Sequence, residues 1–318
     1  MTRSVCHDSY SASRVDCRAT YGRGRCGVSR AFVKLVLVAM LTSAAVRAAE
    51  PVRVTTIRDS QIGESSGLAG SYTHPNAIWI HNDSGDQPRL FLVNLSGETR
   101  AVVHLDGAQA VDWEDMCSFV IDGQPWLLVG DIGDNNRVRG RNQRPPCLYL
   151  LKEPVIPRSN GLPVIRWEVT ASIRFTYEDG PWDCEAVGVD SERKEILLLT
   201  KSGPQHNGLF VLPLDLRRRK QQLTARRIAS PFIPFATGLD ISPSGRTMVV
   251  CTMLNGIAIF RQPGESWQDA FRKPGAPIDL PPRKQGETIC FDRGGAWLYL
   301  NSEEAGQPLW KLAVPTAD

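Results

Sequence analysis

The chain has 318 residues and a formal net charge of +3, and 42% of its residues are apolar, which suits one large globular domain or two small ones. The first 48 residues hold eight Lys and Arg against two Asp, a charge of +6, so residues 49–318 carry −3. This slightly acidic balance excludes the electrostatic footprint of a nucleic-acid-binding protein. We expect the one dense basic run, Arg217–Lys220, to be a solvated hairpin tip.

Residues 1–48 have the features of an export signal. Arg30 and Lys34 precede the apolar run Leu35–Val46, and small residues at its end offer a cleavage site before Ala49. The run is shorter than the roughly 20 apolar residues that span a bilayer. We therefore predict a cleaved leader over 1–48, a single domain over 49–318 without a membrane span, and a periplasmic or secreted protein. An uncleaved N-terminal membrane anchor is the alternative.

Three of the eight cysteines lie in this leader. The remaining five are scattered within apolar runs and show neither CxxC motifs nor histidines at zinc-binding spacing. We therefore predict that they are buried free thiols, and that no disulfide joins Cys117 to Cys290. The five are Cys117, Cys147, Cys184, Cys251 and Cys290.

A repeat of about 50 residues runs through the rest of the chain. Each copy begins with an acid and continues with an apolar strand, a turn, a second strand, a polar loop and a third strand. Glu64, Glu114, Glu185 and Glu287 begin four copies, and Thr237 stands at the corresponding place in a fifth. Only the interval from Glu114 to Glu185 is clearly longer, and its surplus lies in polar, Pro-rich segments of the kind found in loops.

Short alternating strands with Gly, Asp, Asn and Pro turns predict an all-β protein, and a repeat of this length is typical of a β-propeller blade. The last copy ends after its third strand, whereas an extra strand-like segment, Val52–Asp59, precedes the first copy. We predict that this N-terminal strand completes the last blade and closes a ring of five blades. The alternative is a sixth, degenerate blade within the long second repeat.

The stretch from Val111 to Asn136 places Asp112, Glu114 and Asp115 before one apolar run and Asp131 and Asp134 after the next. In a propeller the loops before the first strand and after the second strand of each blade open on the same mouth of the central channel. Carboxylates gathered there cannot all ionise without cations, and hard oxygen ligands favour Ca²⁺ over Zn²⁺. Asp83, Asp122 and Asp134 have an alternative role as turn formers. The predicted ligands are Glu64, Asp83, Glu114, Asp131, Asp134, Glu185 and Glu287.

Several segments also resemble a family of secreted bacterial β-propeller proteins related to those described as phytase-like or "esterase-like activity of phytase". They include "IWIHNDSGD", "DWEDM", "LLVGDIGDN", "DCEAVGVD" and "QGETI". The resemblance extends over Val52 to Ala313 and implies a propeller with an acidic, calcium-binding centre. Thr237 departs from the pattern, since it replaces an acid.

Two functions follow as hypotheses. The first is a metal-dependent hydrolase of a phosphate ester or lactone, with His81 and Lys201 in mouth-facing loops as acid, base or phosphate contacts. The second is a non-catalytic propeller with a structural cation, whose open face binds a glycan or a partner protein. The motif "GESSG" at Gly63–Gly67 precedes a turn and a strand rather than a helix, so it does not predict a serine nucleophile. We expect a small-molecule or glycan ligand at the mouth and a monomeric protein.

Overall fold

The computed structural model describes residues 50–141, 143–203 and 206–316. The predicted leader lies outside these residues. Within the described residues, no helix is long and apolar enough to span a bilayer.

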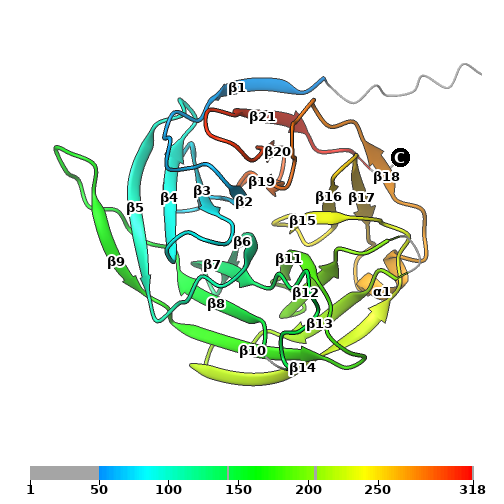
Figure 1. The fold of residues 1–318 in the computed structure, drawn as a ribbon. Helices are drawn as coiled ribbons and strands as arrows, with labels where there is room; N and C mark the ends of the chain where they lie inside the picture. The colour runs from blue at the N-terminus through cyan, green and yellow to red at the C-terminus, as the bar shows by residue number, and fades with distance from the viewer. Residues whose placement is uncertain (1–49, 142, 204–205, 317–318) are drawn as a thin grey trace, which may run out of the picture. The chain divides into compact units, whose positions relative to one another are not determined.

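The described residues form an all-β structure in which antiparallel strands follow one another from the centre outward (Figure 1). The first group holds β2 (Ser65–Gly70), β3 (Ala77–Asn82), β4 (Arg89–Asn94) and β5 (Thr99–Asp106). The second holds β6 (Trp113–Ile121), β7 (Gln124–Asp131), β8 (Cys147–Lys152) and β10 (Ala171–Tyr177).

The third group holds β11 (Cys184–Asp190), β12 (Glu195–Thr200), β13 (Leu209–Pro213) and β14 (Lys220–Ala229). The fourth holds β15 (Ala236–Ile241), β16 (Thr247–Thr252), β17 (Gly256–Phe260) and β18 (Ala276–Ile278), and the short helix α1 (Trp267–Ala270) lies between its last two strands. The last group holds β19 (Cys290–Phe291), β20 (Trp297–Leu300), β21 (Pro308–Ala313) and β1 (Val52–Thr56). Because β1 pairs antiparallel with β21, the N-terminal strand completes the C-terminal sheet, as predicted.

The surplus residues of the long second repeat join existing sheets. Strand β9 (Val164–Glu168) pairs in parallel with β5, and β10 pairs in parallel with β14, which links the second and third groups at their outer edges. The basic run Arg217–Lys220 is exposed in the hairpin formed by β13 and β14, as expected, and its last residue begins β14.

The first strands of the groups form a closed cycle. Strand β2 contacts β6, β6 contacts β11, β11 contacts β15, β15 contacts β19, and β19 returns to β2. Apolar side chains fill the space between neighbouring sheets. For example, Trp79 and Leu90 of the first group pack with Trp113 and Leu127 of the second. The fold is therefore a β-propeller, in which each sheet buries both faces against its neighbours.

Buried side chains tie the inner strands together where no backbone ladder joins them. Asp115 on β6 is fully buried, and its carboxylate accepts the backbone N–H groups of Val187 on β11 at 2.9 Å and Leu239 on β15 at 3.0 Å. Asp240 on β15 accepts the N–H of Phe291 on β19 at 2.8 Å. These bonds satisfy donors that would otherwise be buried without a partner, and they hold the inner strands in register at the centre of the ring.

All five cysteines outside the leader are buried and free, as the sequence predicts. Cys117 lies on β6 and Cys290 on β19, and these two strands are not neighbours in the cycle of inner strands.

Candidate functional site: an acidic mouth

The second residue of several inner strands interrupts its ladder with a register shift of the β-bulge type. Glu114 lies at the shift in β6, Glu185 at the shift in β11 and Thr237 at the shift in β15. A bulge leaves one residue unpaired and redirects its side chain. Glu114 and Glu185 are thereby freed from the ladder at the end of the ring where the inner strands begin.

In the first group, the position equivalent to Glu114 lies two residues later in the chain than the alignment of the sequence repeats predicts. Its register shift lies between Ser65 and Gly67, so Ser66 takes the place that corresponds to Glu114. The Ser66 hydroxyl donates to the backbone carbonyl of Glu114. Glu64 lies just before β2 and is exposed, whereas Glu114, Glu185 and Glu287 are buried. The alignment of Glu64 with the other recurrent acids is therefore wrong in register.

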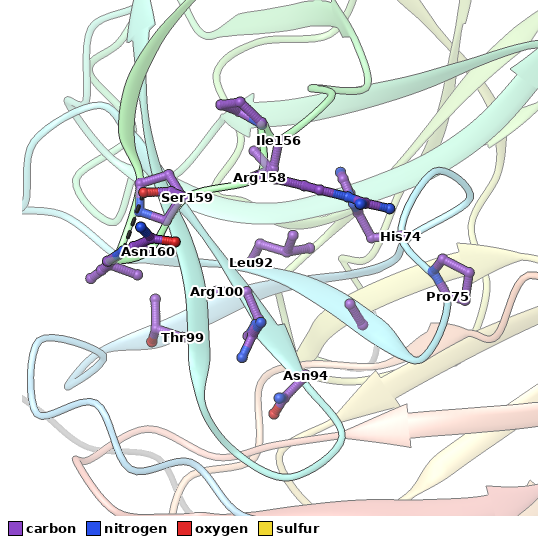
Figure 2. A pocket seen from close by; sticks show the side chains of 15 residues that line it. His74, Pro75, Leu92, Asn94, Thr99, Arg100, Ile156, Arg158, Ser159 and Asn160 are labelled. Carbon is purple, nitrogen blue, oxygen red and sulfur yellow. Dashed lines mark hydrogen bonds between the residues drawn. The ribbon is translucent and has the colours of Figure 1, made fainter.

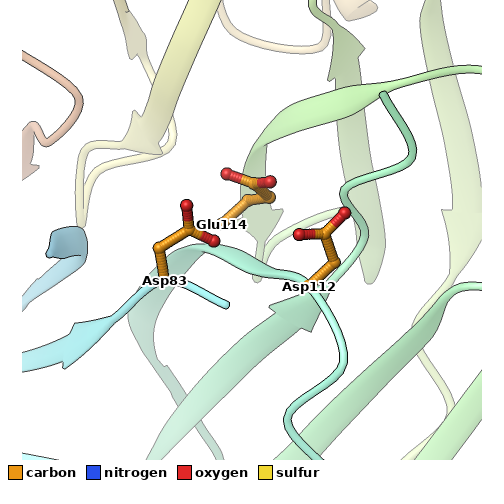
Figure 3. A group of neighbouring side chains, drawn as sticks. All are labelled: Asp83, Asp112 and Glu114. Atoms are coloured by element: carbon orange, nitrogen blue, oxygen red, sulfur yellow. The ribbon is translucent and has the colours of Figure 1, made fainter. Parts of the chain in front are cut away.

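Three carboxylates come together at the mouth (Figure 3). Asp83 lies just after β3, Asp112 lies just before β6, and Glu114 lies within β6. One carboxylate oxygen from each lies within 4.8 Å of the others. This spacing suits three oxygen ligands around one cation. The sequence predicted Asp83 and Glu114 as ligands but not Asp112.

The cluster has an unusual proton affinity. Burial raises the pKa of Glu114 well above its ordinary value, and the nearby acids Glu185, Asp83, Asp112 and Glu287 raise it further. Burial, and then Asp83, raise the pKa of Asp112 to about 6. Without a cation these groups take up protons at a higher pH than ordinary carboxylates do, because their charges repel one another in a poorly solvated place.

Gly133 provides the space that this arrangement needs. A methyl group added to its Cα would lie 2.2 Å from Oε1 of Glu114 and 2.6 Å from Oδ2 of Asp112. The Asp112 carbonyl accepts the N–H groups of Ile132 and Gly133, at 3.0 and 3.2 Å. The segment after β7 thus approaches the carboxylates so closely that a side chain at position 133 would displace them.

Asp131 and Asp134 hold this segment in place. Asp131 is buried and pairs with the buried Arg139, with Nη1 to Oδ1 at 2.9 Å, and it also accepts the N–H of Asp112 at 3.0 Å. Asp134 accepts the N–H groups of Val138 and Arg139 at 2.8 and 2.9 Å. Neither belongs to the three-carboxylate group, and these contacts give both residues a positioning role.

A second set of charged groups lies around this cluster. Lys201, just after β12, places Nζ 2.5 Å from Glu185. Burial lowers the pKa of Lys201, but the Glu185 carboxylate raises it more, so the ammonium stays charged. The same lysine is close enough to oppose the rise in the pKa of Asp83.

On the far side of the mouth, Gln285 donates to Glu287 at 3.1 Å. Burial raises the pKa of Glu303 to about 8, and its hydrogen bond with Glu287 contributes further. Glu303 was not predicted from the sequence, although it lies in the polar loop after β20.

His81 does not lie in a mouth-facing loop, so that prediction is wrong. It is the fifth residue of β3 and is fully buried, with Nδ1 2.9 Å from the Asn82 carbonyl oxygen and its ring edge-on to Trp113. Burial lowers its pKa to about 4. Gly67 across the ladder leaves room for the ring, since a methyl group there would lie 2.0 Å from Nε2. His81 is thus a neutral packing residue.

A large cavity lies away from this mouth. A space of about 920 Å³ opens beside β3, β4 and β5 under the segment Ile156–Pro163, and Figure 2 shows His74, Arg100 and Arg158 around it. It contains none of the acidic residues named above.

No protein-family model matches the chain, and no curated protein sequence matches it. Solved structures of similar fold include a gluconolactonase from Xanthomonas campestris, with 10% identity over 83% of this chain and 89% of that one and a TM-score of 0.44. They also include the PQQ-bound aldose sugar dehydrogenase from Streptomyces coelicolor, with 10% identity, 84% and 98% coverage and a TM-score of 0.45. Likenesses at this level do not define the activity of this chain.

Proposed function

We propose that the protein is a divalent-cation-dependent hydrolase that cleaves a carboxylic ester or lactone at the acidic mouth. The observation that carries this proposal is the convergence of Asp83, Asp112 and Glu114, whose oxygens lie within 4.8 Å of one another. The space left by Gly133 supports it independently, because a side chain there would occupy the place of the carboxylates.

The residues suit Ca²⁺ in particular. All three are hard oxygen donors, which Ca²⁺ prefers, and none is a thiolate or imidazole of the kind that selects zinc. A bound cation supplies Lewis-acid polarisation of the substrate oxygen and acidifies a water molecule. It also relieves the repulsion that raises the pKa values of Asp112 and Glu114.

Lys201 provides a second function within the same mouth. Its ammonium group, held by Glu185, is placed to stabilise negative charge that develops on the carbonyl oxygen. Glu185 acts here as a positioning residue. We assign no role in proton transfer to His81, because its ring is fully buried.

The charge of the mouth favours a neutral substrate over a phosphate ester. Even with a divalent cation and Lys201, the acids around the mouth leave an excess of negative charge, which repels a phosphate dianion. A lactone or carboxylic ester brings no such charge. The acids concerned are Glu64, Asp83, Asp112, Glu114, Glu185 and Glu287.

The test is hydrolysis by the purified protein with Ca²⁺, Mg²⁺ or Mn²⁺ and with a chelator. Lactones, aryl esters and a phosphomonoester serve as substrates. We expect lactone or ester hydrolysis that the chelator abolishes and that Asp112→Asn lowers at least about 100-fold, whereas the exposed Asp279→Asn has no effect. A cation that stabilises the fold without hydrolysis of any substrate would favour the non-catalytic propeller. Faster turnover of the phosphomonoester would contradict the choice of substrate.

A further inference from the structure

The mouth is polar on one side and apolar on the other. Four large apolar side chains are exposed in the two loops of the fourth group that open at this end of the ring. Phe232 is 76% exposed and Leu254 is 83% exposed. We call the four residues the apolar rim: Phe232, Phe235, Met253 and Leu254.

The rim belongs to the repeat unit that lacks the recurrent acid. Thr237 occupies the bulge of β15, where β6 and β11 have Glu114 and Glu185. The loop after β16 exposes Met253 and Leu254, whereas the corresponding segment after β7 holds the buried Ile132 and then Gly133, followed by Asp134. Acids and apolar side chains are thus segregated around one opening.

Hydrogen bonds connect the rim to the charged groups. The N–H of Phe235 donates to the carbonyl of Ser202 at 3.1 Å, and its own carbonyl accepts the N–H of Met253 at 3.2 Å. Ser202 directly follows Lys201, whose ammonium contacts Glu185. One backbone path therefore leads from Lys201 to Phe235 and Met253.

Phe235 is held in an unfavourable backbone conformation. Its φ of 56° lies in the left-handed region, which is uncommon and unfavourable for a bulky side chain. Thr252 fixes the adjoining turn, because its hydroxyl accepts the N–H groups of Leu254 and Asn255 at 3.2 and 3.0 Å. These contacts hold the backbone at Phe235 and at Leu254 in place at the opening.

We infer that the substrate is an ester or lactone with an aliphatic or aromatic arm, and that this arm lies on the apolar rim while the carbonyl lies at Lys201 and the carboxylate cluster. This inference rests on the proposed function. It assigns Phe235 and Leu254 as residues that determine specificity. The four rim side chains are uncharged and apolar, so they favour contact with an apolar arm and provide no hydrogen-bond partners for a polar sugar arm.

The direct test is calorimetric binding of 2-alkylcyclopentanones, which imitate lactones but cannot be hydrolysed, with methyl, butyl and octyl arms and saturating Ca²⁺. A fully buried methylene contributes about 0.8 kcal/mol, or about fourfold in affinity. We expect the butyl compound to bind at least about tenfold more tightly than the methyl compound. In Phe235→Asn and Leu254→Ser this gain should fall below about threefold, with the affinity of the methyl compound unchanged. Asparagine tolerates the left-handed conformation, so Phe235→Asn is expected to fold.

Val155→Ser is the matched control, since Val155 is 63% exposed and lies outside the rim. Equal affinity for all three arms in the wild-type protein would overturn the inference, whether or not the protein hydrolyses lactones. Chain-length-dependent binding without hydrolysis of any ester would instead overturn the proposed function. Sedimentation with phosphatidylglycerol vesicles that is lost in Leu254→Ser, together with equal affinities, would reassign the rim to a lipid surface and contradict the inference.

Discussion

Asp115 and Leu239 are 124 positions apart in the chain, yet the Asp115 carboxylate accepts the Leu239 backbone N–H at 3.0 Å in the centre of the ring. The same oxygen accepts the N–H of Val187. One side chain on β6 therefore satisfies donors on β11 and β15. The side chain of the neighbouring Glu114 lies at the mouth instead, because the bulge in β6 frees it from the ladder and redirects it.

We expect Asp115→Ala to destabilise the protein strongly. The change leaves the buried N–H groups of Met116, Val187 and Leu239 without their acceptor, and each unsatisfied group costs about 1–3 kcal/mol. Urea unfolding should show a loss of about 3 kcal/mol or more, against less than about 0.5 kcal/mol for the exposed Asp279→Ala. Equal losses in the two variants would show that the central carboxylate does not hold the inner strands.

Gly133→Ala should abolish cation binding while the fold persists. The added methyl would displace the carboxylates of Glu114 and Asp112, which it would approach to 2.2 and 2.6 Å. Gly63→Ala is the matched control, because no atom lies within 4 Å of the added methyl at that position. Calorimetric titration with Ca²⁺ should show binding in the control and none in Gly133→Ala. Unchanged affinity in both variants would place the cation elsewhere.

Lys201→Gln should separate cation binding from catalysis. Removing the ammonium frees Glu185 and makes the mouth more negative, so Ca²⁺ affinity should rise by about fivefold, or about 1 kcal/mol. The kcat of ester hydrolysis should fall by about 100-fold to 1000-fold, because the developing oxyanion loses its positive partner. A loss of both properties together would show that Lys201 only maintains the structure of the mouth.

The stabilisation by Ca²⁺ should depend on pH. Burial and neighbouring acids raise the pKa of Asp112 to about 6 and raise that of Glu114 more strongly. The folded protein then binds more protons than the unfolded chain, so without a cation its unfolding free energy falls as pH rises from about 4 through 6 and above. Ca²⁺ replaces these protons, so its effect on Tm should be larger at about pH 7.5 than at about pH 5. An effect that is equal at both pH values would contradict raised pKa values at the cation site.

The repeat, the strands and the closing N-terminal strand could be predicted from the sequence because they rest on local patterns. Apolar alternation and turn glycines mark each strand, and the recurrence of Glu114, Glu185 and Glu287 marks the mouth. The error of two residues at Glu64 arose because a bulge changes register without any local signal, so that Ser66 occupies the equivalent place.

The details of the site depend on contacts that spacing does not reveal. Asp131 and Asp112 both flank apolar runs, but only the fold shows that Arg139 neutralises Asp131 and leaves Asp112 beside Glu114. His81 follows an apolar run in a segment rich in polar residues. Its burial depends on the open space at Gly67 across the ladder.

The central claim is that a cation binds at Asp83, Asp112 and Glu114, and the most direct measurement is the thermal unfolding midpoint with and without Ca²⁺. A ligand at about 100 times its Kd stabilises the folded state by about 2.7 kcal/mol, which should raise Tm by about 5–10 °C. Glu114→Gln removes one charge at nearly constant shape and should abolish most of this rise, whereas Glu98→Gln, exposed in the turn between β4 and β5, should keep it. A Tm that no divalent cation changes, or an equal rise in Glu114→Gln, would contradict the account.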